Sequence, residues 1–196
     1  GLDNKANHAW RQASLDFLNG KISPKQWVSR VSKLKTTANF LSSPKTKGLR
    51  EETGQFTSKA VQGEMLVLTW KGTPCITSTD IGKTRPLPPA GRLQSWFLSM
   101  RDYLGPTLYL RNEIKPSDYA KLKVVRADAK PGVLIYEVKL GKGTVRFHFN
   151  NGPKPVPMPD AGKEYSIMQI GFNFEKDPPE MLTNGFFITD TSEAKN

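Results

Sequence analysis

The sequence predicts an α+β protein in which a basic helical hairpin precedes a mostly antiparallel β-sheet or sandwich carrying one amphipathic helix. Three observations lead to this fold class. Apolar residues recur at helical spacing near the amino end, an aromatic stripe at the same spacing occupies about residues 91–104, and alternating segments separated by turn signals fill the second half. The 196 residues include 10 Phe, 5 Tyr and 4 Trp, which suffice for a hydrophobic core. We expect a helical hairpin appendage at 1–41, a basic polar loop at 42–55, a β-rich domain at 56–190 and a tail at 191–196.

Two helices are predicted in the first 35 residues. Apolar side chains recur at i, i+3, i+4, i+7 and i+11 from Ala6 to Phe17, and Asn19-Gly20 is a plausible C-terminal stop. Ser23 before Pro24 is typical of a helix N-cap followed by a first-turn proline. The second helix buries Trp27 and neighbouring apolar residues. The outer surface of the pair then carries Lys21, Lys25, Arg30 and Lys33.

The middle of the chain is interpreted as strand, loop and helix. The continuous apolar run from Met65 to Trp70 favours a strand covered on both faces. A stripe of Leu, Met and aromatic residues predicts the helix at 91–104, which Gly105-Pro106 would end. Further strands are expected at 107–111, 123–127, 133–140, 144–149, 165–174 and 185–190.

Residues 133–149 form a predicted hairpin whose alternation gathers charged groups on one face. A strict three-residue loop would place apolar residues opposite polar ones, so a four-residue connection, Gly141–Thr144, or a loop with a bulge is expected. This register pairs Val138 with Phe147, Tyr136 with Phe149, Glu137 with His148, and Lys139 with Arg146.

The charge distribution suggests a polyanionic partner. Basic residues number 29 and acidic residues 18, which gives a formal net charge of +11. Residues 1–60 hold 11 basic and 4 acidic groups, an excess of +7, whereas 61–120 and 121–196 each carry +2. Such a localised excess favours phosphate-backbone recognition, although a solvated basic surface without a partner has the same pattern. The sequence therefore predicts non-catalytic nucleic-acid binding, with RNA preferred and genome packaging or coating as one form of it.

The predicted contacts include basic residues of the hairpin and of the following loop. They are Lys21, Lys25, Arg30, Lys33, Lys45, Lys47 and Arg50, with Lys139 and Arg146 as secondary contacts. The amino-terminal helices also offer a surface for self-association.

Two alternative functions use other residues. Glu137, Arg146 and His148 supply the base, cation and acid of a metal-independent ribonuclease, and the layout of helices before an antiparallel sheet is similar to that of small microbial ribonucleases. The proline-rich loop at 83–89 has the spacing of a polyproline ligand, which would make the chain a protein-binding scaffold.

Other classes of site are not predicted. Gly82-Lys83-Thr84 imitates the end of a phosphate-binding loop, but the prolines that follow exclude the helix that such a loop requires. One Cys and two distant His give no metal cage, and no cofactor is expected. No segment has the roughly 20 apolar residues of a membrane helix. The single cysteine favours a reducing intracellular compartment.

Overall fold

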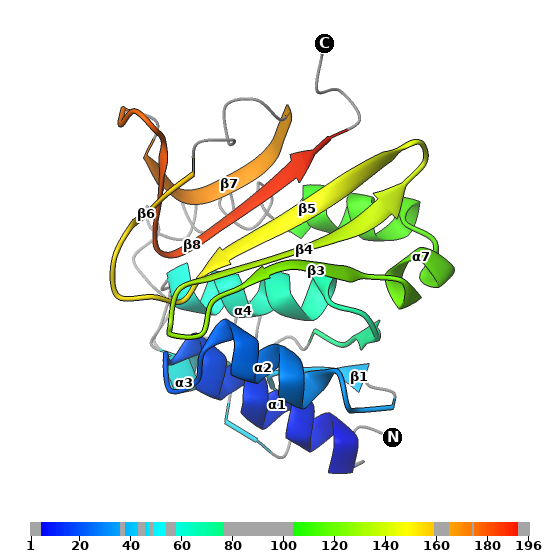
Figure 1. Cartoon of the computed structure of the whole chain (residues 1–196). Helices are drawn as coiled ribbons and strands as arrows, with labels where there is room; N and C mark the ends of the chain where they lie inside the picture. Colours follow the sequence, from blue (N-terminus) through cyan, green and yellow to red (C-terminus); the bar gives the residue numbers. More distant parts are fainter. Residues whose placement is uncertain are drawn as a thin grey trace, which may run out of the picture.

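The computed structural model describes residues 5–35, 38–42, 46–47, 49–53, 58–76, 104–158, 165–173 and 175–191. Helices occupy much of the first half and an antiparallel sheet fills the second, so the α+β class is confirmed (Figure 1). The helices α1, α2 and α4 lie along one side of the curled sheet (Figure 1). In the part of the chain that is described, no helix is both long and apolar enough to cross a membrane.

The two amino-terminal helices form as predicted. Helix α1 spans Lys5–Leu18 and ends where Gly20 adopts a φ of +67°. Helix α2 spans Pro24–Val31. The Ser23 hydroxyl accepts a hydrogen bond from the Gln26 backbone N–H, and the Gln26 side chain accepts one from the Ser23 N–H, which completes a capping box. Trp10, Phe17 and Trp27 are fully buried.

Residues 58–76 correct the prediction of a strand at Met65–Trp70. Helix α4 spans Ser58–Thr69, and every residue from Gln62 to Thr69 is buried. An apolar run that is covered on all sides has the same composition in a helix as in a buried strand, so hydrophobic periodicity does not distinguish them. The short helix α3, Leu49–Thr53, precedes α4 within the predicted polar loop. At Gly63 of α4, an added Cβ would lie 2.9 Å from a methyl group of Leu18.

A small parallel ladder joins two segments that flank α3 and α4. Strand β1, Ala38–Asn39, pairs with β2, Thr73–Pro74. The Arg111 guanidinium donates to the carbonyls of Leu68 and Trp70 at 3.1 Å each and lies 3.7 Å from the centre of the Tyr119 ring. This arginine therefore satisfies carbonyl groups at the carboxyl end of α4, which have no partner within the helix.

Residues 104–113 are helical, so the predicted strand at 107–111 is wrong. Leu104, Thr107, Leu110 and Ile114 are buried at helical spacing, and Gly105-Pro106 lies in the first turn of the described helical residues. The rest of the helix predicted at 91–104 lies outside the described residues. Helix α7, Pro116–Ala120, then leads into the sheet.

Within the residues that the structure describes, the antiparallel sheet has six strands. Their order is β3–β4–β5–β8–β6, with β7 also paired to β8. The strands are β3 Lys123–Ala127, β4 Val133–Leu140, β5 Gly143–Asn150, β6 Val156–Pro157, β7 Tyr165–Asn173 and β8 Glu180–Asp190. The predicted strands at 123–127, 133–140, 144–149, 165–174 and 185–190 are thus confirmed within one or a few residues at their ends.

The hairpin register differs from the prediction by two residues. Strands β4 and β5 are joined by Gly141-Lys142 alone, and Gly141 has a φ of +60°, which suits a tight two-residue hairpin turn. Glu137 is therefore opposite Arg146, and His148 is opposite Ile135. Because side chains alternate with a period of two, a two-residue shift leaves every side chain on its predicted face.

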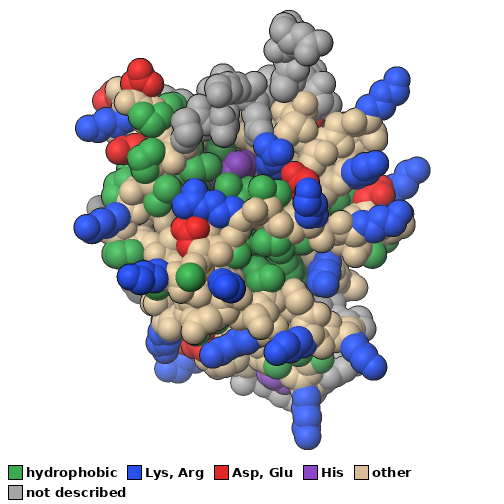
Figure 2. All heavy atoms as spheres, in the orientation of Figure 1, with side chains coloured by type: hydrophobic (Ala, Val, Ile, Leu, Met, Phe, Trp, Pro, Cys, Tyr) green, Lys and Arg blue, Asp and Glu red, His purple; other side chains and the backbone are tan. Residues whose placement is uncertain are grey.

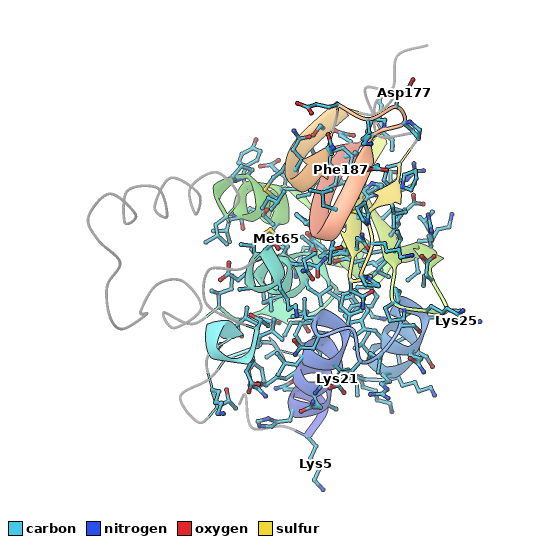
Figure 3. All side chains as sticks on the ribbon, turned by 90° about the vertical axis from the view of Figure 1, so that its left-hand side faces the viewer. Lys5, Lys21, Lys25, Met65, Asp177 and Phe187 are labelled. Atoms are coloured by element: carbon cyan, nitrogen blue, oxygen red, sulfur yellow. The ribbon has the colours of Figure 1, made fainter. Side chains whose placement is uncertain are left out.

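Aromatic side chains connect the helices to the inner face of the sheet. Trp27 of α2 contacts Trp70 with ring centroids 4.5 Å apart, and Trp70 contacts Tyr136 of β4 at 5.0 Å. The Tyr136 hydroxyl is hydrogen-bonded to the Thr69 hydroxyl. One hydrophobic cluster runs from α1 through α4 to β4, β5 and β8, so the helices and the sheet share a core. In Figure 3, Met65 lies within this core, whereas Lys5 and Lys25 project from the molecule.

Buried amides fix the helices against the ends of the strands. The Gln62 side chain of α4 donates to the backbone carbonyls of Asn150 and Gly185 at 3.1 and 3.0 Å. The Asn151 side chain donates to the carbonyls of Phe17 and Ile22 and accepts from the Gly132 N–H. These contacts join α4 and the α1–α2 connection to the sheet through groups that water does not reach.

Gln62→Met is expected to destabilise the protein, because the two strand carbonyls lose their buried donor while side-chain volume is nearly kept. The free energy of unfolding should fall by roughly 1–3 kcal/mol. Urea denaturation measures this change. Gln12→Met on the exposed side of α1 is the matched control and should change stability by no more than about 0.5 kcal/mol. Equal stability of the two variants would show that the Gln62 contacts contribute nothing.

Candidate functional site

The predicted charged cluster lies on the sheet face turned away from α1, α2 and α4, here called the outer face. Glu137 and Lys139 from β4 alternate with residues of the inner face, as do Arg146 and His148 from β5. A second hydrophobic cluster occupies part of the same face. It consists of Val133, Ile135, Met158, Met181 and Phe187. The sequence therefore brings the predicted residues to one face, beside apolar side chains that the prediction did not include.

Glu137 is engaged by two cations. The Arg146 Nε donates to its Oε2 at 3.0 Å, and the Lys123 Nζ lies 3.5 Å from its Oε1. The Glu137 side chain is 17% exposed. The Glu137 carboxylate therefore forms ion pairs with an arginine and a lysine. It does not act as a base paired with His148, which lies opposite Ile135.

His148 is buried, with 6% of its surface exposed. Its Nε2 lies 3.1 Å from the Thr189 hydroxyl, and its ring packs on Phe187 at 5.4 Å between centroids. Burial, together with the nearby Arg146 charge, lowers the pKa of His148 from 6.5 to about 3. Such an imidazole is neutral at pH 7 and does not serve as the general acid that the ribonuclease alternative requires.

The predicted nucleic-acid contacts lie mainly on the surface. Lys21, Lys25, Arg30 and Lys33 are exposed around the α1–α2 hairpin, and Lys47 is also exposed. The Arg30 charge is partly neutralised, because its guanidinium lies 3.5 Å from the Asp16 carboxylate.

The structure describes the side chains of only some of the remaining predicted contacts. Arg50 belongs to helix α3, and Lys45 falls outside the described residues. The proline-rich loop at 83–89, predicted as a protein-binding segment, also falls outside them. Lys139 is exposed and Arg146 is paired with Glu137. Figure 2 shows Lys and Arg side chains dispersed over both the helical layer and the sheet of the visible face.

A pocket at one end of the sheet contains residues that the sequence analysis did not select. Its volume is about 320 Å³. It lies where the end of α1, the start of α4, the β3–β4 turn and strand β8 meet, at the left-hand end of the sheet in Figure 1. The sequence signal was weak, since Asn19-Gly20 marks a helix end and Asn151-Gly152 follows a strand, and both pairs are typical of ordinary turns.

Metal ligands are not gathered in the described ranges: no group of three or more His, Cys, Asp or Glu side chains lies together there. Cys75 is a free thiol beside the β1–β2 ladder, where its backbone N–H donates to the Asn39 carbonyl. Partial burial raises the pKa of the Cys75 thiol.

Comparison with solved structures identifies a shared fold. A debranching enzyme from Nostoc punctiforme superimposes with a TM-score of 0.67 at 13% identity, covering 94% of this chain and 47% of that chain. A maltogenic amylase from S. marinus gives a TM-score of 0.68 at 16% identity, covering 94% and 28%. A cyclomaltodextrinase gives 0.61 at 16% identity, covering 94% and 36%. This chain thus spans less than half the length of each of these enzymes.

No family model matches the sequence, and no curated protein matches it. The structural matches nonetheless correct the functional prediction. The fold is that of part of several amylase-like glycosidases, not that of a nucleic-acid-binding protein, and the predicted nucleic-acid role was wrong. The ribonuclease alternative also fails, because the buried His148 is neutral, whereas the proline-rich loop of the scaffold alternative lies outside the described residues.

The neutral His148 should make stability depend on pH. The unfolded chain binds a proton near pH 6.5, whereas the folded chain binds it only near pH 3. Stability from this residue is therefore present above pH 6.5 and is lost as the pH falls toward 3, by about 1.4 kcal/mol per pH unit. The ring resonances of His148 in NMR spectra should not titrate between pH 8 and pH 5.

The matched stability measurement compares two variants across the same pH range. His148→Leu should flatten the decline of unfolding free energy below pH 6.5, and His8→Gln, at an exposed position of α1, should leave the His148 contribution unchanged. A His148 titration midpoint near 6.5 would contradict the buried, neutral imidazole.

Proposed function

We propose that this chain forms one part of a glycoside-hydrolase-like protein that binds malto-oligosaccharides. The observation that carries the proposal is the match of 94% of the chain to a debranching enzyme, a maltogenic amylase and a cyclomaltodextrinase. The names of all three refer to enzymes of carbohydrate breakdown. Because a fold hosts many functions, the substrate class is inferred from this recurrence among the matches and not from the fold as such.

Four carboxylates of the described part form ion pairs, which makes them poor candidates for the catalytic acid of a glycosidase. Glycosidases cleave with two carboxyl groups, one of which must hold a proton. Four described carboxylates are paired with arginine instead. The pairs are Asp16 with Arg30, Glu52 with Arg11, Asp128 with Arg126, and Glu137 with Arg146. In the proposed protein these acids stabilise the scaffold, and the acid and base of any cleavage belong to other residues.

Retardation in a polysaccharide gel tests the proposal directly. Electrophoresis of the folded chain through a native gel containing amylopectin should give a lower relative mobility than a gel without polysaccharide. Added maltoheptaose should restore the mobility, because it competes for the same contacts. A gel containing dextran, which has different glycosidic linkages, is the control. Unchanged mobility in amylopectin would overturn the proposed saccharide class.

A reducing-sugar assay on the same amylopectin separates binding from cleavage. We expect the retarded chain to release no reducing ends, since the proposal assigns the acid and base of cleavage to other parts of the protein. Release of maltose or longer products would contradict the assignment of the acid and base to other parts of the protein, while leaving the saccharide class intact.

A further inference from the structure

The pocket at the end of the sheet is built from five separate segments of the chain. Helix α1 and its terminal turn supply one wall, the first turn of α4 a second, and the β3–β4 turn, the β5–β6 connection and β8 the others. Figure 3 views the molecule from this end. The polar side chains that line it include those of Asn19, Lys59, Asn151, Thr183 and Asn184.

The walls of this pocket are held in place by hydrogen bonds that do not involve a ligand. The Asn151 side chain uses its donors on the carbonyls of Phe17 and Ile22, and its oxygen accepts from the Gly132 N–H. The turn after α1 is closed by the Gly20 N–H on the Phe17 carbonyl and the Lys21 N–H on the Asp16 carbonyl. A ligand therefore meets a largely preformed site and loses little affinity to ordering the protein.

The polar groups of the pocket suit an anion that also carries hydroxyl groups. The half-buried Lys59 ammonium donates to the Asn19 Oδ1 at 3.3 Å, which occupies one of its three N–H groups. None of the described lining residues is acidic, so these residues provide no carboxylate to neutralise this charge. The amide of Asn184 and the hydroxyl of Thr183 provide uncharged donors and acceptors nearby.

We propose that this pocket binds a monosaccharide-sized polyol bearing one phosphate group, with Lys59 contacting the phosphate and Asn184 contacting hydroxyl groups. A volume of 320 Å³ is at the lower end of the range for small-molecule sites, which fits one sugar ring better than an oligosaccharide. Hydrogen bonds from an ammonium to an anionic oxygen are about twice as strong as neutral ones, so the phosphate provides most of the affinity. The proposal does not depend on malto-oligosaccharide binding, because it uses a different ligand charge and a defined set of residues.

Glucose 6-phosphate, glucose and inorganic phosphate are suitable probes for titration by NMR. Glucose 6-phosphate should bind at least tenfold more tightly than glucose. Lys59→Gln should weaken its binding at least tenfold, the change expected when one charge-assisted hydrogen bond is lost. Lys21→Gln is the matched control, since Lys21 is exposed beside the pocket but does not line it.

A second variant tests the hydroxyl contacts without altering the charge. Asn184 has a φ of +58°, a conformation that glycine adopts freely, so Asn184→Gly removes the amide while keeping the backbone. This variant should weaken binding of glucose 6-phosphate and leave inorganic phosphate unaffected. The folded state of each variant is checked by its amide spectrum.

Three results would overturn the site. These are equal affinities for glucose and glucose 6-phosphate, undiminished binding in a folded Lys59→Gln variant, and the absence of shifts at pocket residues with glucose 6-phosphate at about 10 mM, well above a millimolar dissociation constant. Failure of amylopectin to retard the chain would leave these outcomes unchanged, so the two proposals are tested separately.

Discussion

The contact between the helices and the inner face of the sheet is the constraint on which the rest of the structure depends. An antiparallel sheet with one apolar face must cover that face, and α1, α2 and α4 do so. The ring contacts Trp27–Trp70 and Trp70–Tyr136 connect the helical layer to strand β4. The Tyr136 hydroxyl is hydrogen-bonded to the Thr69 hydroxyl at the end of α4. The outer face of the sheet is not covered by these helices and carries ion pairs and a smaller apolar cluster. Glu137, Arg146 and His148 lie on this face.

The same arrangement explains why His148 and Glu137 do not form a catalytic pair. Alternation along β4 and β5 places both on the outer face, as the sequence indicates, but the register and the packing decide their chemistry. The two-residue turn at Gly141-Lys142 sets Glu137 opposite Arg146. The ring of His148 is enclosed with Phe187 and is left neutral. Residue types on one face are thus a weaker guide to catalysis than the partners each side chain acquires.

Local signals were sufficient for the elements whose ends are encoded within a few residues. The Ser23–Pro24–Gln26 cap and the Gly20 turn fix α1 and α2, and period-two alternation identifies the hairpin. Sequence periodicity did not predict the structure of segments that are buried on all sides. Met65–Trp70 is such a segment, and tertiary packing decides whether it forms a helix or a strand. Residues 107–111 have β-forming side chains, yet Leu104, Thr107, Leu110 and Ile114 follow a helical stripe. The pocket was missed because its lining comes from five segments that are far apart in the sequence. The net charge of the chain does not identify which residues bind a ligand.

Gly63 shows how a missing side chain sets the spacing of the helical layer. The position of its absent Cβ lies within 3.2 Å of leucine methyl groups from α1, α3 and the segment before α3, so three parts of the chain converge there. An alanine would favour the helical backbone by up to about 1 kcal/mol. It would also press on Leu18, Leu41 and Leu49 together. Whether the protein tolerates an alanine at this position therefore depends on whether the three leucine side chains can change rotamer together. The stability of such a variant measures how readily the core can repack.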